Sequence, residues 1–571
     1  MDKRNFLKIR FKFRPTIRLR TLLLLLTAGA AENLWADLSQ PGAITRELQQ
    51  QDQRQQVMGE QRRPGTPDVR LRSAPDRLPE QFPRESPCFL IRQVELQGAE
   101  AELRQLLQPL AGQAEGMCLG LEGIRLLMRR MQNRLVEEGY VTTRVLAPAQ
   151  DLAPGVLRLR IVAGRVGRIR GRQGSRRDLA GIIPLRSGDL LDLRALEQGL
   201  ENLRRLPGSR ADVRLVPGER SGESDLQVSW QQQKPWRFSL ALDDTGSEQT
   251  GKRQAAATLF LDNPLGKGDL FYISRGRDLL NGDPGGSDSL QLHYSLPRGY
   301  WLFSLNAARY DYYQTVSSGV VDYRYRGEGE SIQLGLERVL YRGMHARTSL
   351  GFELGRRASS NFIDDIEIEL QHRRTAYGQF TLRHRQYLER ATLDLALTYR
   401  TGLKVLDAEP APEERSGGAS AREALWRVGV DLQLPFKAAG RRFRYHGALR
   451  GQIARGELTP PERFSIGNRW TVRGFDGQAS LVADSGWYLR NELVWPLSQQ
   501  RARLFAGLDL GRVSGGGSEL LPGQSLAGAV VGIRGEMERL QYEVFAALPL
   551  NKPARFESDS STFGFSLNWQ W

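Results

Sequence analysis

Apolar and polar residues alternate with a period of two along residues 563–571, the last of the chain. Phe563, Phe565, Leu567, Trp569 and Trp571 are separated by small or polar residues. A period of two is typical of a β-strand with one apolar and one polar face. The pattern therefore predicts a C-terminal strand, which either borders a soluble sheet or closes a barrel in a membrane.

The same alternation recurs through residues 234–571. Trp301, Phe303 and Leu305 mark the apolar face of one such segment, and residues 391–399 form another. Turns rich in Gly, Asp, Asn and Pro separate the segments. Sixteen strands would take about 21 residues each with its connection, which suits membrane strands of about 10 residues. The pattern alone does not distinguish sixteen strands from two fewer or two more.

The N-terminus predicts a secretory signal. A long basic stretch, Lys3 to Arg20, precedes the short apolar run Leu22 to Leu26 and then several small residues. Cleavage would follow Ala30 or Ala36, and we favour Ala36, which assigns residues 1–36 to the signal. A membrane anchor is the alternative, but the apolar run is far shorter than the roughly 20 residues that a spanning helix needs.

Export and repeated alternation together predict a bacterial outer-membrane β-barrel, because without spanning helices only a closed barrel satisfies the backbone in lipid. A mean hydropathy of −0.45 fits strands that have one face in water. The formal net charge is +16, of which about +10 remains after the signal is removed. Nucleic acid is not expected as a partner of an exported chain. Arginines that line a lumen or face lipopolysaccharide phosphates explain the charge better.

Residues 37–87 are polar and divide into two segments. Residues 37–60 are rich in glutamine and favour a helix, whereas the prolines of residues 61–87 favour an extended linker. The helix is either free on its tether or docked in a pore, as a plug, and the pattern leaves both possibilities open.

Two tandem β-α-α-β-β modules are expected before the barrel, at residues 88–163 and 164–233. In the first, a strand over 89–96 and helices over 101–110 and 121–138 precede strands over 141–146 and 156–162. The second repeats this order at reduced length, with a strand over 166–169, a helix over 193–206, and a hairpin of strands over 211–216 and 225–230. Exposed edges of such small sheets can accept a guest strand from another polypeptide.

The two cysteines of the chain, Cys88 and Cys118, are expected to form a disulfide, since the chain is exported and their number is even. Closing this loop of about 30 residues is worth roughly 3–4 kcal/mol. Two free buried thiols are the alternative. With 5 histidines and no His/Cys cluster, no metal and no cofactor are expected.

One segment of the barrel region, residues 466–477, is too polar and too rich in glycine for a membrane strand. It contains Arg473 beside a glycine turn. Further along the chain, Asp509 shares one strand face with Gly507 and Gly511, while the other face of that strand is apolar. Asp509 should therefore point into the lumen from a wall that a loop can approach closely. Either Arg473 forms a bidentate pair there, or the two residues are unrelated charges.

These residues make a family recognisable. Over essentially its whole length the chain resembles the two-partner secretion transporters of the ShlB/FhaC/HecB family. Val472, Arg473, Gly474 and Phe475 match the signature of that family's inward-folded loop, and residues 507–511 match the inner-wall motif. Further matches lie at residues 139–144, 196–201 and 261–266. The resemblance implies that Arg473 pairs with Asp509, that the two modules are POTRA domains, and that Cys88 and Cys118 lie in the first. It also places residues 40–60 at the position of the plug helix.

These arguments predict a mainly β protein: a sixteen-stranded outer-membrane barrel at residues 234–571 preceded by two periplasmic POTRA domains. By resemblance it exports one unfolded exoprotein of adhesin or haemolysin type, and it is not an enzyme. Outer-membrane lipid, lipopolysaccharide and the barrel assembly machinery are the other expected partners. An outer-membrane assembly factor of the same superfamily is the alternative. A passive porin would lack the modules, and a surface lipase would need a nucleophile motif that the sequence does not contain.

Overall fold

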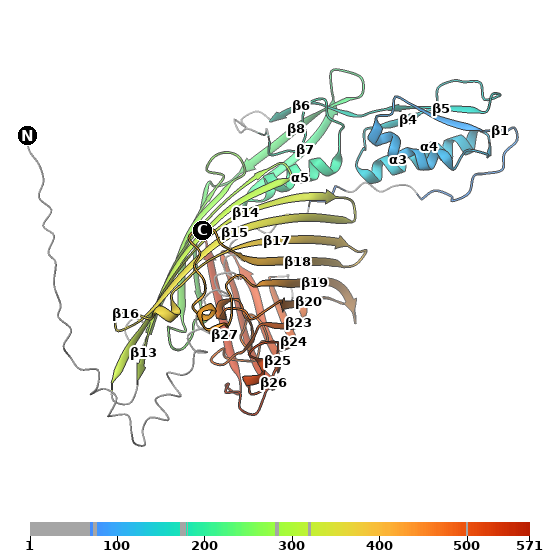
Figure 1. Ribbon diagram of the computed structural model, residues 1–571. Coiled ribbons are helices and arrows are strands. Elements are labelled where there is room, and N and C mark those ends of the chain that lie inside the picture. The colour runs from blue at the N-terminus through green and yellow to red at the C-terminus, as the bar shows by residue number, and fades with distance from the viewer. Residues whose placement is uncertain are drawn as a thin grey trace, which may run out of the picture.

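The structure of the protein is a computed structural model that describes residues 69–71, 77–171, 179, 181–279, 285–317, 321–497 and 501–571. The predicted signal (1–36), the predicted plug helix (37–60) and part of the predicted linker (61–87) lie outside the described residues. Figure 1 shows a large barrel with two small α/β modules at one of its ends. None of the described helices has the length and apolar character that crossing a membrane would require.

The first module is a three-stranded sheet covered by two helices. A parallel pair, β2 with β5, and an antiparallel pair, β4 with β5, form the sheet. Leu103 and Leu107 of one helix pack with Leu127 and Met131 of the other on the same core. The elements are β1 (Phe89–Leu90), β2 (Gln93–Gln97), α3 (Ala101–Gly112), β3 (Cys118–Leu119), α4 (Leu121–Glu138), β4 (Arg144–Leu146) and β5 (Val156–Val162).

The first module differs from the expected pattern at its first strand. The single strand predicted over 89–96 is divided in two, because Phe89 and Leu90 pair with β3 whereas residues 93–97 pair with β5. The alternation within one segment predicts a strand, but it does not show that the two halves of the segment pair with strands of different sheets.

The second module contains β6 (Arg165–Gly171), α5 (Leu193–Arg204), β7 (Ser209–Pro217) and β8 (Glu223–Gln232), with strand order β6-β8-β7. The strand, helix and hairpin predicted for this module are confirmed, but the β-α-α-β-β order is not, since α5 is the single helix among the residues that the structure describes here. Pro184 and two glycines with positive φ, Gly181 and Gly188, interrupt the region in which a first helix would lie. Asp192 caps α5 by accepting hydrogen bonds from two backbone N–H groups of its first turn.

The predicted fold class is confirmed: sixteen antiparallel strands form a closed barrel. The two-residue strand β16 pairs with the last residues of β15. The last strand pairs with the first from Ser566↔Asp243 to Gln570↔Ser239 and so closes the barrel. The first eight elements are β9 (Trp236–Asp243), β10 (Gln254–Asp262), β11 (Leu270–Asp278), β12 (Gly285–Arg298), β13 (Trp301–Ser317), β14 (Asp322–Arg342), β15 (Ala346–Ile363) and β16 (Ile366–Glu367). The remaining strands of the wall are β17 (Arg373–Tyr387), β18 (Thr392–Leu403), β19 (Ala424–Ala438), β20 (Arg441–Ala454), β23 (Ser485–Pro496), β24 (Ala502–Ser514), β25 (Ser525–Met537), β26 (Leu540–Asn551) and β27 (Thr562–Gln570).

Apolar side chains cover the outside of this wall. Phe563 and Trp569 of the closing strand are 75% and 48% exposed, as the alternation at the C-terminus predicts for a surface that lipid would cover. The inward positions between them carry smaller or polar side chains. The exposed aromatic row is therefore the outer face of the barrel rather than an uncovered core.

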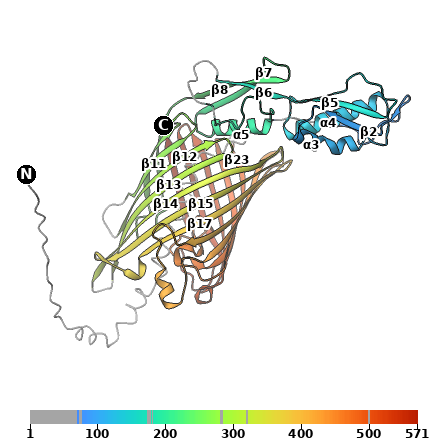
Figure 2. The same cartoon turned by 45° about the horizontal axis from the view of Figure 1, so that its top comes forward.

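The two modules lie end to end: the second is at one mouth of the barrel, and the first extends from it past the rim (Figure 2). Glu201 of α5 forms ion pairs with Arg342 at the end of β14 (2.8 Å) and with Arg347 near the start of β15 (2.9 Å). Asn202 donates to the backbone oxygen of Gly299 in the turn between β12 and β13. The helix face that meets the barrel is thus polar, buried and paired.

Candidate functional site: the inner loop and its wall

A long segment between β20 and β23, residues 455–484, turns back into the barrel; we call it the inner loop. It contains the short strands β21 (Phe464–Ile466) and β22 (Leu481–Ala483), which pair with each other, and the 3₁₀ turn η3 (Pro460–Glu462). Its tip carries Val472, Arg473, Gly474 and Phe475, all of which are buried. The loop lies against the inner face of β24, because Asp509 is 1% exposed while its neighbours Leu508 and Leu510 are 56% and 41% exposed.

Arg473 forms a bidentate pair with Asp509. Its Nε lies 2.6 Å from Oδ2 and its Nη2 lies 2.9 Å from Oδ1, and its backbone N–H donates to the same carboxylate. Both side chains are almost completely buried. Parallel donation by a planar guanidinium is the strongest and most directional form of such a pair.

Glu492 of β23 is a second partner of Arg473, at 2.8 Å from Nη1, and it also pairs with Arg534 of β25. Arg534 in turn lies 3.4 Å from Glu543, so the ion pairs extend from the loop along the wall. Arg490, opposite Asp509 in the β23–β24 ladder, donates to the backbone oxygen of Trp470 in the loop. Glu492, Arg490 and Arg534 were not candidates from sequence, because their relation to the loop depends on strand register.

Glycines in the wall make room for the loop. A Cβ at Gly528 would lie 1.8 Å from the backbone oxygen of Arg473, and one at Gly507 would lie 2.7 Å from its Nη2. A Cβ at Gly511 would press on Val472 at 2.9 Å. Gly474 has a φ of +114°, in the left-handed region that favours glycine, and a Cβ there would meet the backbone oxygen of Leu548.

Val472 and Phe475 fix the loop through apolar packing on either side of Arg473. Both belong to a buried cluster formed by the loop and the wall, and the ring of Phe475 meets that of Phe556 edge-on at 5.6 Å. Every residue of the Val-Arg-Gly-Phe tetrad thus has a contact of its own, and each of the three wall residues Gly507, Asp509 and Gly511 faces it.

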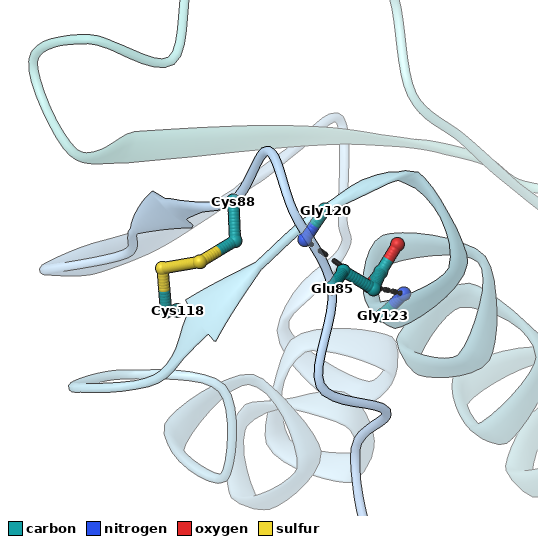
Figure 3. The surroundings of a disulfide bond; sticks show 5 residues. All are labelled: Glu85, Cys88, Cys118, Gly120 and Gly123. Carbon is teal, nitrogen blue, oxygen red and sulfur yellow. Dashed lines mark hydrogen bonds between the residues drawn. A yellow bond between two sulfur atoms is a disulfide. The ribbon is translucent and has the colours of Figure 1, made fainter.

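The disulfide pair lies far from the loop, in the first module. Cys88 and Cys118 are joined, with a sequence separation of 30, immediately before α4. Figure 3 shows that Glu85 lies beside this bond and faces the start of α4. Its carboxylate accepts hydrogen bonds from the N–H groups of Gly120, Glu122 and Gly123. Although desolvation opposes ionisation, these donors hold the pKa of Glu85 below its ordinary value.

We expect the disulfide to stabilise the first module by roughly 3–4 kcal/mol, because it lowers the conformational entropy of the unfolded chain. Replacing both Cys88 and Cys118 by serine should make this module the first part of the full-length protein to be cleaved in limited proteolysis. The bond itself is tested by mass spectrometry of the unreduced protein. Two alkylatable thiols in freshly isolated membranes would contradict the prediction.

Comparisons with known proteins agree on one family. The model for the haemolysin secretion/activation protein ShlB/FhaC/HecB matches residues 222–535, a ShlB-type POTRA model matches residues 89–164, and a further POTRA model matches residues 165–217. The chain is 33% identical to the outer membrane transporter CdiB-2 of Burkholderia pseudomallei (strain 1026b), over 96% of this chain and 98% of that one.

Two further likenesses cover most of the chain. It is 27% identical to the hemolysin transporter protein ShlB of Serratia marcescens, over 76% of this chain and 77% of the relative. The solved structure of CdiB from Acinetobacter baumannii superposes with a TM-score of 0.83 at 27% identity, over 92% of this chain and 99% of that one. Both the modules and the barrel are therefore shared with these proteins.

Proposed function

Since the chain belongs to the ShlB/FhaC/HecB haemolysin secretion/activation family and is an outer-membrane transporter of two-partner secretion, we propose that the Arg473–Asp509 pair holds the inner loop in its working position. Its POTRA domains lie in the periplasm. The observation that carries the proposal is the bidentate, almost fully buried contact between a loop arginine and a wall carboxylate. A loop that lies inside a pore must be kept in one place if a polypeptide is to pass it.

The exported partner proposed here is one large, unfolded exoprotein of adhesin or haemolysin type. Strands β2 and β4 border the first POTRA sheet, and β6 and β7 border the second. On three of these strands a backbone N–H already has a partner: Val94 donates to Glu115, Val145 to Gln132 and Val166 to the backbone oxygen of Asp189. Leu146 of β4 and Leu215 of β7 are 47% and 39% exposed on two of these edges. Border strands with exposed apolar side chains suit the capture of an extended segment by strand addition. The periplasm has no ATP, so folding of the exported chain outside the cell would supply the free energy.

Residues 37–60 are proposed to occupy the pore at rest. The described part of the tether supports this, because residues 69–71 are bound at the periplasmic mouth of the barrel. The N–H of Leu71 donates to Glu197 at 2.7 Å, and Arg342 donates to the backbone oxygen of Val69 at 2.8 Å. The segment between residues 60 and 69 can span at most about 30 Å when extended. A helix ending at residue 60 can therefore reach from this anchor into the lumen.

Deleting residues 37–60 should raise the single-channel conductance in planar bilayers while the barrel stays folded, because a helix about 10 Å wide would leave the lumen. A variant in which the same residues are replaced by a Gly/Ser segment of equal length serves as the control for tether length. It should show the raised conductance as well. Parental conductance in the deletion variant would instead favour a free N-terminal helix.

Lipid, lipopolysaccharide and the barrel assembly machinery are the proposed partners of the barrel. We also propose that the protein has no enzymatic activity. The outward row of apolar side chains suits lipid contact, and a chain that must insert as a closed barrel needs assistance in avoiding exposed strand edges. The family consists of transporters, which is consistent with a chain that performs no catalysis.

A further inference from the structure

Near its tip the inner loop is held by the Arg473 network and by an Arg469–Asp244 ion pair of 2.6 Å, and it has a further charged contact with the barrel at its root. Glu462 ends the η3 turn, and its Oε1 lies 2.5 Å from Nη2 of Arg400 on β18. Its Oε2 lies 3.3 Å from Nη2 of Arg427 on β19, and Oε1 lies 3.5 Å from Nη1 of Arg357 on β15. One loop carboxylate thus meets three wall arginines that come from three different strands.

Uncharged contacts hold the same root in place. Gln452 of β20 donates from Nε2 to the backbone oxygens of Glu462 and Asp484, at 2.8 and 3.0 Å, and so joins the beginning and the end of the loop. The side-chain oxygen of Gln452 accepts from Nε of Arg427 at 2.9 Å. Gln452 therefore orients one of the arginines toward the carboxylate that this arginine binds.

The Arg473 contact at the tip and the Glu462 contact at the root have opposite polarity and lie on different parts of the barrel wall. At the tip, the loop supplies a guanidinium and strands β23 and β24 supply carboxylates; at the root, the loop supplies a carboxylate and β15, β18 and β19 supply guanidiniums. A segment fixed at one point can still pivot about that point. A segment fixed to two separate walls has a defined path across the lumen, which leaves a defined opening beside it.

We propose that Glu462 is a positioning residue for secretion, a second anchor that fixes the root of the inner loop on the β15–β19 wall. The proposal rests on the proposed function in that it assigns the loop a working position. It further assigns the three arginines a shared task, because without the carboxylate three like charges would face one another in a partly buried site. Without this attraction the root of the loop would leave the wall more often, and the uncompensated arginines would repel one another and lose their common orientation.

The test reports loop position separately from secretion. Cys88 and Cys118 are the only cysteines of the chain and are paired, so a Ser465→Cys substitution introduces a single reactive thiol between the two anchors. Ser465 is 6% exposed. Its cysteine should react slowly with a membrane-impermeant maleimide added to whole cells. In the Glu462→Gln background we expect labelling to be about tenfold faster, because the root opens more often.

Glu330→Gln is the matched control. Glu330 lies on the wall strand β14 and pairs with Arg356 at 3.0 Å, a contact between wall residues that does not include the loop. It should leave labelling of the Ser465→Cys reporter unchanged. Heat-modifiable migration in SDS gels verifies that each variant is a folded barrel. If Glu462→Gln does not give such a barrel, Arg400→Gln takes its place, with a smaller expected acceleration because Arg427 and Arg357 still contact Glu462.

Labelling of the Glu462→Gln variant at the parental rate would overturn the second anchor. Faster labelling together with an equal effect in the Glu330→Gln control would overturn it too, since the opening would then follow from any loss of lumen charge. Faster labelling that is specific to Glu462→Gln but leaves secretion normal would overturn Glu462 as a positioning residue for secretion, whereas failure of the proposed function would show as normal secretion by the Arg473 and Asp509 variants. A Glu462→Asp variant should restore slow labelling in part, because it keeps the charge.

Discussion

Replacing Arg473 by alanine is expected to lower secretion of the exoprotein by at least about tenfold while the barrel remains folded. Removing one partner of a buried ion pair typically costs about 3–5 kcal/mol, because the remaining charge is left without compensation. Here two carboxylates, Asp509 and Glu492, lose a shared partner. The barrel has its own closed ladder, so this cost should displace the loop rather than unfold the wall.

The geometry also orders the variants. Asp509→Ala should impair secretion less than Arg473→Ala, since Arg473 would keep its contact with Glu492 and Glu492 would keep Arg534. The double variant should be no worse than Arg473→Ala alone, because residues that act as one unit give non-additive effects. Arg473→Lys should behave like the alanine variant, since an ammonium group cannot donate in the parallel, bidentate manner.

Arg383→Ala is the matched control for these variants. Arg383 pairs with Glu337 at 2.9 Å between two wall strands and does not contact the inner loop. Secretion into the medium, measured relative to the amount of folded transporter, should stay near the parental value. Defects of Arg473→Ala and Asp509→Ala that multiply independently would show that the two residues do not act as a pair. Normal secretion by both single variants would refute their functional assignment altogether.

The inward direction of Asp509 follows from sequence because it depends on one strand alone. Leu508 and Leu510 must face lipid, so Asp509 must face the lumen, whichever strands lie beside it. The contribution of Glu492 does not follow, because it requires the β23–β24 register that places Glu492 opposite Gly507. The role of Gly528 cannot be predicted from sequence for the same reason, because its position beside Asp509 depends on the register of β24 and β25.

Contacts between distant segments were likewise beyond the sequence pattern. Glu85 lies 35 residues before the backbone N–H of Gly120 to which it binds, and no local period relates the two. The Pro-rich composition of residues 61–87 predicts an extended chain but not the surfaces that it follows. Val69, for example, packs into the core of the second POTRA domain rather than lying free in solvent. At Val69, packing against the second POTRA domain thus decides where the chain lies.

Reversing the charge of Glu201 is expected to reduce secretion nearly as far as deletion of residues 88–233, for which we expect complete loss with the barrel still inserted. Glu201 is 3% exposed and lies between Arg342 and Arg347, and it also accepts from the N–H of Val69. A lysine there would place a third cation in a buried site, where an unpaired charge costs about 3–5 kcal/mol. The second POTRA domain should then leave the barrel mouth, and a captured segment would no longer be delivered to the pore.

The Glu201→Lys result must be separated from a general failure of the domain to fold. Glu219→Lys reverses a charge on the same domain, at a side chain that is 67% exposed and bound to Arg168, and it should leave secretion unchanged. Combining Glu201→Lys with Arg347→Glu should restore part of the activity, because the two exchanged charges again attract each other and a merely misfolded domain would gain nothing from the second change. Parental secretion by Glu201→Lys would mean that docking of the POTRA domain on the barrel does not limit export.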